Sequence, residues 1–146
     1  LAPVSLVAAA PSLLVVNPAL PVRDAASFIA WARANSGRIS YGSGGVGNAS
    51  HLQIFMLMQH IGAEATHIPY RGTAAALTDV AAGNVQFMSD AINTALPLAR
   101  EGRVRAIAVT TRERSPMLPE VPSMAESGLM PPGFDTGIWQ GIMVPA

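Results

Sequence analysis

The sequence predicts an α/β fold in which a mostly parallel β-sheet is flanked by helices. Short apolar runs rich in β-branched residues alternate along the chain with stretches whose apolar residues recur with the period of an α-helix. Glycine, proline and asparagine separate the two kinds of segment, as they do in turns. The apolar runs show little alternation between apolar and polar residues, which is typical of strands covered on both faces.

The first half of the chain begins this alternation. Leu13–Val16 is a continuous apolar run closed by an Asn-Pro turn, and it predicts a buried strand. Asp24 is a suitable N-cap for a helix whose apolar residues follow a 3.6-residue period and which ends before Gly37. Ile39–Gly42 predicts the next strand, and a second helix is expected to begin near Asn48.

The second helix carries apolar residues around nearly its whole circumference. Leu52, Phe55 and Met56 share one face, whereas Ile54 and Leu57 lie on the other. This pattern is typical of a helix that is buried on two sides.

Two more pairs of strand and helix follow. Ala65–Ile68 and Val85–Ser89 predict strands, and Thr73 is expected to be the N-cap of the helix between them. The next helix should begin near Thr94, because proline is tolerated only in the first helical turn and Pro97 follows closely.

The last part of the chain changes character. Val104–Val109 predicts a further strand without polar alternation. Residues 110–133 contain five prolines and one predicted short helix, Ser123–Ser127, and Ile138–Val144 returns to strand composition. We therefore expect one domain in which an irregular segment precedes the last strand.

Composition excludes several classes of function. The 146 residues are half hydrophobic and 12% charged, with nine basic and nine acidic side chains and no basic stripe, so nucleic-acid binding is not expected. The absence of cysteine excludes disulfides and thiol catalysis. No acid accompanies the three histidines at ligand spacing, so neither a metal nor another cofactor is expected. Leu1–Val16 lacks a basic start and contains two prolines, so it predicts neither a secretion signal nor a membrane span.

The stretch Tyr41–Leu52, YGSGGVGNASHL, is the most informative for function. Three closely spaced glycines lie between a predicted strand and a predicted helix. Glycine lets the backbone approach a ligand closely, and the start of the helix presents unpaired N–H groups to the loop. This combination is suited to binding an anion.

An alternative function is a nucleotide-binding, Rossmann-like enzyme domain that uses the GSGGVG loop, because Gly42, Gly44 and Gly47 match the dinucleotide fingerprint. That fold should place an acid at the end of the following strand, where this chain has Tyr70 and Arg71. A tight turn without a ligand is a third interpretation. No nucleophile, base and acid occur at a recognisable spacing, so the sequence does not predict an enzyme.

Polar side chains near the loop are candidates for ligand contact. Ser43, Asn48 and Ser50 can hydrogen-bond a carboxylate, although N-capping explains at least one of them. His51 is expected to be neutral, because the positive end of the helix dipole disfavours its charged form. Asp90 ends a strand and either faces a ligand or caps a turn.

Four blocks of sequence, in this order, resemble the extracytoplasmic solute receptors of tripartite tricarboxylate transporters, the Bug-type binding proteins. The blocks are YGSGGVGNASHL, HIPYRGTAAALTDVAAGNVQFMSD, ALPLAREGRVRAIAVTTRERSPMLPEVPSMAESG and WQGIMVPA. The resemblance implies a periplasmic protein without catalytic activity that closes around a small organic carboxylate or amino acid. It further implies delivery of that ligand to the membrane permease subunits of the transporter.

The resemblance also implies that residues 1–146 form one lobe of a two-lobed fold similar to type II periplasmic binding proteins. This lobe would be the second, ligand-binding lobe, with crossover segments at about 1–17 and 136–146. The first lobe and the C-terminal segment of the family would be absent from this chain. Open strand edges and apolar surface left without that lobe predict self-association.

The resemblance assigns ligand binding mainly to backbone N–H groups and short side chains of the glycine loop. The loop residues are Ser43, Gly45, Gly47, Asn48, Ala49 and Ser50. The matching residues outside the loop are Tyr70, Arg71 and Asp90. Family members often have threonine where this chain has Asn48, and both residues can cap a helix and donate a hydrogen bond.

Overall fold

The computed structural model describes residues 2–145, which form six strands and four helices. The strands are β1 (Ala2–Val16), β2 (Ile39–Ser43), β3 (Ala65–Pro69), β4 (Phe87–Ala91), β5 (Arg105–Val109) and β6 (Gly137–Val144). The helices are α1 (Ala25–Ala34), α2 (Ala49–Ile61), α3 (Thr73–Ala82) and α4 (Ile92–Arg100). None of these helices has the length and apolar composition needed to cross a bilayer.

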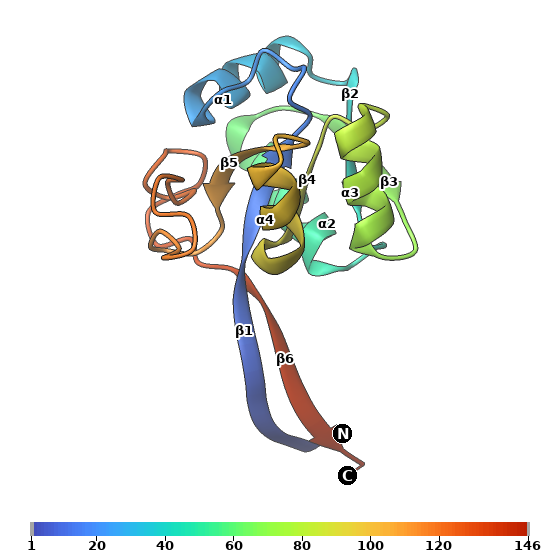
Figure 1. Ribbon diagram of the computed structural model, residues 1–146, viewed down its shortest axis with the longest axis vertical. Coiled ribbons are helices and arrows are strands. Elements are labelled where there is room, and N and C mark those ends of the chain that lie inside the picture. Colours follow the sequence, from blue (N-terminus) through green and yellow to red (C-terminus); the bar gives the residue numbers. More distant parts are fainter. Residues whose placement is uncertain (1, 146) are drawn as a thin grey trace.

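Five strands form the sheet of the body in the order β3-β2-β4-β1-β5, and β6 pairs with β1. β2 pairs in parallel with β3 and β4, whereas β1 lies antiparallel between β4 and β5. Four of these five strands therefore run in one direction, and β1 runs against them in the interior of the sheet (Figure 1). The predicted α/β class is confirmed, and the inverted β1 makes the sheet mixed.

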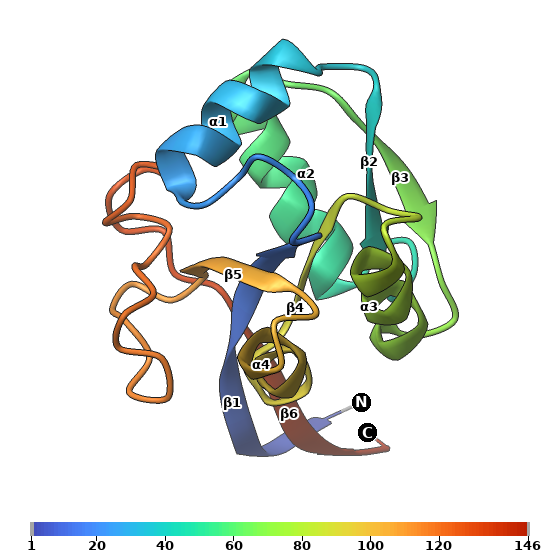
Figure 2. The ribbon, with the colours of Figure 1, turned by 45° about the horizontal axis from the view of Figure 1, so that its top comes forward.

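Helices cover both faces of the sheet. Side chains alternate along β1, so that Leu14 and Val16 contribute to one hydrophobic core while Leu13 and Val15 contribute to the other. Residues of α1 and α2 belong to the first core, and residues of α3 and α4 belong to the second (Figure 2). Burial on both faces explains why these strands show no polar alternation in the sequence.

The first half of β1 leaves the body together with β6. Residues 2–11 pair antiparallel with β6 and form a two-stranded ribbon that projects from the rest of the molecule (Figure 1). The strand predicted at Ile138–Val144 is thus confirmed, but β1 extends far beyond the predicted Leu13–Val16. Pro3 and Pro11 are compatible with this extension, because the ribbon leaves one side of each strand unpaired. Its exposed large apolar side chains are Val4, Leu6, Val7, Trp139, Ile142, Met143 and Val144.

Two predicted helix starts are wrong by one or two residues. The N-cap of α3 is Gly72 rather than Thr73, and no side chain caps this helix. α4 begins at Ile92, not near Thr94, so that Pro97 lies inside the helix. Proline has no N–H to donate to the carbonyl of Asn93, but both residues are exposed, and water can satisfy that carbonyl.

The second helix is buried on one side only, which contradicts the prediction from its composition. Ile54, Leu57 and two other residues of the buried face, Met58 and Ile61, contribute to the core, whereas Leu52 and Phe55 are 48% and 51% exposed. Met56 is similarly exposed. The exposed face of α2 has no partner among residues 2–145.

The proline-rich segment after β5 lies along the edge of the sheet. The Val109 N–H donates to the Pro122 carbonyl at 2.9 Å, and the Met124 N–H donates to the Val109 carbonyl at 2.8 Å. The helix predicted at Ser123–Ser127 is wrong, because the chain makes hydrogen-bonded turns there instead. Gly128, with a φ of 77°, turns the chain away after a single turn.

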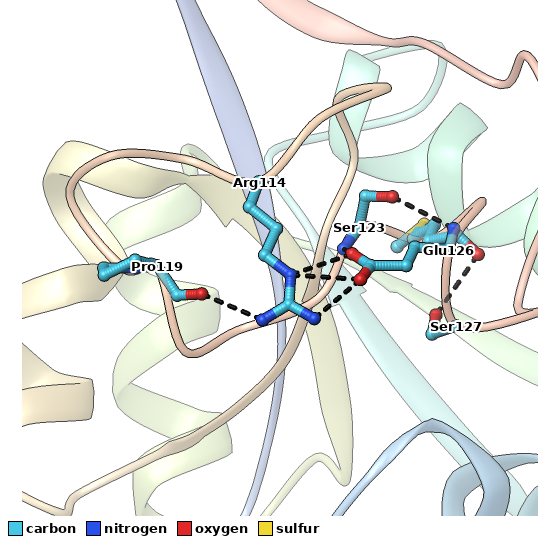
Figure 3. A network of polar contacts seen from close by, with 6 residues as sticks. Arg114, Pro119, Ser123, Glu126 and Ser127 are labelled. Atoms are coloured by element: carbon cyan, nitrogen blue, oxygen red, sulfur yellow. Dashed lines mark hydrogen bonds and ion pairs between the residues drawn. The ribbon is translucent and has the colours of Figure 1, made fainter.

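An ion pair ties this segment together on the surface. Nε and Nη2 of Arg114 donate to the carboxylate of Glu126 at 2.9 and 2.6 Å, and Nη1 donates to the Pro119 carbonyl at 2.9 Å (Figure 3). The hydrogen bonds from Arg114 hold the pKa of the Glu126 carboxyl below its ordinary value. The Ser123 hydroxyl accepts from the Glu126 N–H at 3.0 Å, so both sides of this turn are held in place.

Candidate functional site

The glycine loop connects the end of β2 to the start of α2. Asn48 is the N-cap of α2, and its side-chain oxygen accepts a hydrogen bond from the Ser50 N–H at 3.1 Å, as expected from the sequence. The loop lies at the carboxyl end of β2, where the N-terminus of α2 points its free N–H groups outward.

Each of the three glycines is required for a different reason. A Cβ on Gly44 would lie 2.9 Å from Cγ2 of Thr73, so this position has no room for a side chain. Gly45 has open space around it but adopts a φ of 132°, which other residues rarely reach. At Gly47 a side chain would meet no neighbour within 4 Å, so glycine is required there only because the backbone is left-handed, with a φ of 78°.

Hydrogen bonds within the loop fix its shape. The Gly44 N–H donates to Ser50 Oγ at 3.0 Å, and the Gly45 N–H donates to Ser43 Oγ at 3.1 Å. The Gly47 N–H donates to Nδ1 of His51 at 3.0 Å. These bonds leave a small set of free donors.

Two backbone N–H groups of the loop have no partner among residues 2–145. They belong to Val46, at the tip of the loop, and Ala49, the first residue of α2. Val46 is 79% exposed, so a ligand can reach this tip. An anion placed there would receive these two donors and the favourable end of the α2 dipole.

A pocket of about 300 Å³ lies beside the loop. It is lined by the N-terminal residues of α3 and α4 and by the base of the ribbon: Ala8, Ala10, Thr73, Asp90, Ala91, Asn93, Thr94, Ile138 and Gln140. Neither α3 nor α4 has a side-chain cap, so their first N–H groups are not satisfied by a capping side chain. The close approach of Gly44 to Thr73 joins the loop to this pocket.

The predicted site residues are only partly brought together. Ser43, Gly45, Gly47, Asn48, Ala49 and Ser50 all lie in the loop or the first turn of α2. Asp90 is 1% exposed and lines the neighbouring pocket, where its Oδ2 accepts from the Thr94 hydroxyl at 2.7 Å. Asp90 therefore faces the candidate site and also fixes the first turn of α4.

Tyr70 and Arg71 lie outside this arrangement. The Tyr70 hydroxyl donates to Oδ2 of Asp79 at 2.7 Å, and burial, together with that carboxylate, raises the pKa of Tyr70 to about 12. At the base of the loop, the Tyr70 N–H donates to the Ser43 carbonyl at 2.9 Å, and its ring lies beside Gly42. Arg71 is exposed and forms no ion pair within residues 2–145.

Two histidines that the sequence pattern does not connect stack beneath the loop. The rings of His51 and His67 are 4.0 Å apart and nearly parallel, and the Tyr41 ring packs against both, at 5.0 Å from His67 and 6.3 Å from His51. Nε2 of His67 lies within hydrogen-bond distance of Ser43 Oγ. Burial is the main cause that lowers the pKa of His67, and the neighbouring His51 lowers it further.

A buried polar network joins α2 to the base of the ribbon. Nε2 of Gln53 donates to Ser12 Oγ and to Thr136 Oγ1, both at 3.2 Å, and the Ser89 hydroxyl donates to its Oε1 at 2.6 Å. Gln53 is 3% exposed, and three separate segments converge on its amide. The helical pattern of the sequence places Gln53 on the buried face but cannot show these partners.

A further pocket lies elsewhere. It measures about 370 Å³ and lies at the other end of the sheet, beside the C-terminus of α4 and the start of β5. A helix C-terminus disfavours anions, and no glycine loop is near. Within residues 2–145, no group of three acidic or histidine side chains could hold a metal ion.

Comparisons with known proteins match this arrangement to one family. The family model described as "Tripartite tricarboxylate transporter family receptor" matches residues 1–146. The chain is 39% identical over 143 residues to a UPF0065 protein from the tcbD-tcbE intergenic region of Pseudomonas sp. strain P51 and 33% identical over 145 residues to the protein BugT of Bordetella pertussis. It covers 42% and 44% of their lengths, and the matches include 98% and 99% of this chain.

Solved structures show the same fold. The structure of R. palustris Rpa4515 with adipate has a TM-score of 0.89 and 37% identity, over 94% of this chain and 46% of the other. MatC (Rpa3494) from Rhodopseudomonas palustris with bound malate has a TM-score of 0.88 and 33% identity, over 95% and 47%. The periplasmic binding protein BugD has a TM-score of 0.89 and 35% identity, over 95% and 46%.

Proposed function

This chain belongs to the tripartite tricarboxylate transporter receptor family, and we propose that its glycine loop binds a carboxylate group of a small organic acid. The family consists of non-enzymatic solute-binding receptors, so the prediction that the chain is not an enzyme is confirmed. The alternative of a nucleotide-dependent enzyme that uses the GSGGVG loop is accordingly set aside.

The observation that carries the proposal is the pair of free N–H groups of Val46 and Ala49 at the N-terminus of α2. Neutral backbone donors can bind a carboxylate without a cationic side chain, because the helix dipole adds a partial positive charge. This agrees with a chain of zero formal net charge.

A dicarboxylate is the ligand class that fits best. With one carboxylate at the loop, the rest of the ligand would extend into the adjacent pocket, at the starts of α3 and α4. Two similar proteins were solved with adipate and with malate, both of which carry two carboxylates. Asp90 would repel a second carboxylate placed against it, so it favours a ligand that offers a hydroxyl or ammonium donor at that point.

We also propose that residues 1–146 form one lobe of a two-lobed protein, with the crossovers at about 1–17 and 136–146. The chain spans less than half of each similar structure, and its ribbon exposes Val4, Leu6 and Trp139, which a second lobe would cover. In this arrangement the ligand lies between the lobes, in the periplasm, and the closed protein delivers it to the membrane subunits of the transporter.

Calorimetric titration of the two-lobed protein with adipate, malate, other organic acids and amino acids tests the binding function. We expect saturable binding of at least one dicarboxylate and no binding of NAD or NADP. If none of the organic acids produces heat or raises the melting temperature, the proposed function is wrong.

Residues 1–146 alone are expected to self-associate through the apolar ribbon. Light scattering at micromolar concentration should show a species larger than the monomer, because edge strands with exposed apolar side chains pair readily. Leu6→Lys and Ile142→Lys place charges on this ribbon and should restore the monomer. A wild-type chain that stays monomeric would contradict the expectation.

A further inference from the structure

We propose that His51 and His67 are positioning residues that hold the two ends of the glycine loop in its binding conformation only while both imidazoles are neutral. The proposal rests on the proposed function, because it concerns the same loop. It adds a dependence on the acidity of the surrounding medium: ligand capture should weaken as the medium becomes more acidic.

His51 holds the end of the loop nearest α2. Its Nδ1 accepts the Gly47 N–H at 3.0 Å, which requires a lone pair on that nitrogen. Protonation would place two N–H donors against each other and break the bond. Gly47 would then lose the only contact of its N–H among residues 2–145, and the neighbouring free donor of Val46 would lose its fixed direction.

His67 holds the other end through Ser43. The Ser43 side chain is fully buried, and its Oγ lies within hydrogen-bond distance of His67 Nε2 as well as of the N–H and the carbonyl of Gly45. A change in the charge of His67 therefore acts on the peptide groups of Gly45. The two imidazoles thus control the loop from both sides.

The two rings lie in contact. At a centroid separation of 4.0 Å, a charge on His51 disfavours a second charge on His67. The other aromatic rings packed against the pair are Tyr41 of β2 and Phe55 of α2.

No charged group near the pair, within residues 2–145, compensates a cation there. Burial raises the pKa of Tyr41, so this ring stays neutral while the imidazoles titrate. Glu64, just before β3, is exposed, and the ion pairs found in this part of the chain involve neither histidine.

The pH range follows from His67. Its pKa in the fold is below the ordinary value of 6.5, mainly because of burial and also because of His51. The unfolded chain therefore takes up the proton first, and the stability that neutral His67 contributes is complete above pH 6.5 and is lost as the pH falls below it. Loosening of the loop is expected on the acid side of this value.

NMR spectroscopy of the 146-residue chain tests the loop without any ligand. Between about pH 8 and about pH 5, on either side of ordinary imidazole titration, the ring nitrogens of both histidines and the amide of Gly47 are followed together. We expect unprotonated Nδ1 in His51 at the upper pH and loss of hydrogen-exchange protection at Gly47 as the rings take up protons. Unchanged protection at Gly47 after both rings are charged would overturn the proposal.

Conservative variants separate positioning from simple packing. Asparagine places an oxygen near the position of Nδ1, and glutamine places an amide near Nε2, but neither side chain titrates. His51→Asn and His67→Gln together should keep Gly47 protected at both ends of the pH range, whereas His51→Ala should lose protection throughout. His60 lies on the exposed side of the same helix, so His60→Asn should leave the pH dependence of Gly47 protection as it is in the wild type.

Affinity measurements with adipate and malate on the two-lobed protein give the second readout. Between about pH 7.5 and about pH 5, on either side of imidazole titration, we expect the affinity to fall about tenfold, the effect of one ordinary hydrogen bond. The affinity of the double variant should not change over this range. Tighter binding at acidic pH, as expected from attraction between imidazolium and carboxylate, would overturn the proposal. If the loop titrates as expected but neither acid binds at any pH, the proposed function fails and the role of the histidines in the loop stands.

Discussion

Replacing Phe87 with alanine is expected to lower the free energy of unfolding by about 3–5 kcal/mol, the usual cost of removing a buried aromatic side chain. Phe87 is fully buried at the start of β4, in the middle of the sheet. Its ring packs edge-on against Phe28 at 5.3 Å and Trp31 at 6.1 Å, and it stacks with Tyr41 at 5.9 Å. One deletion therefore leaves a cavity between α1 and β2.

Chemical denaturation followed by tryptophan fluorescence and by circular dichroism measures this change. Phe55→Ala is the matched control, because it removes the same side chain from the exposed face of α2, where Phe55 is 51% exposed. The control should cost less than about 1 kcal/mol, as most surface substitutions do. Similar costs for the two variants would mean that the core around Phe87 is not packed as described.

Gly45→Ala is expected to reduce carboxylate affinity about 10- to 100-fold in the two-lobed protein, because forcing a non-glycine residue into such a conformation costs about 1–3 kcal/mol. The space around Gly45 is open, since the nearest atom, the Tyr70 carbonyl oxygen, lies 3.8 Å from the point that an alanine Cβ would occupy. The effect therefore comes from the φ of 132° and not from a clash. Relief of this strain would turn the peptide groups that precede Val46.

Gly62→Ala provides the control for Gly45→Ala. Gly62 ends α2 with a φ of 65° and has no neighbour within 4 Å, so alanine there is strained but far from the loop along the helix. It should lower the melting temperature and leave the affinity for adipate and malate unchanged. Equal affinities of Gly45→Ala and the wild type would show that the loop does not bind the carboxylate.

The order of strands and helices could be predicted because each element has a local signal. Asp24 forms the predicted cap, accepting the Ser27 N–H at 2.8 Å, and Asn48 caps α2. The orientation of β1 could not be predicted, because it depends on pairing with Ala91 and Val109, residues nearly eighty and a hundred positions away. Short apolar runs look alike whichever way the strand runs in the sheet.

For the site as well, features with a local signal in the sequence could be predicted, whereas contacts between distant residues could not. The glycine loop is a local pattern, and its residues lie together as expected. The contact between His51 and His67 joins α2 to β3 and has no local signal, although both histidines are visible in the sequence. The failure of Tyr70 to present its hydroxyl to the loop has a specific cause, because Asp79 accepts its hydrogen bond.

The pairing of β1 with β6 has a consequence for protein engineering. Ala2 lies opposite Val144 in the ribbon, so the chain enters and leaves the body through two adjacent strands. A body that is entered and left through adjacent strands can be inserted into a surface loop of another protein without stretching its host. The ribbon would then connect the body to the host, and a fluorescent host protein could report changes at the glycine loop.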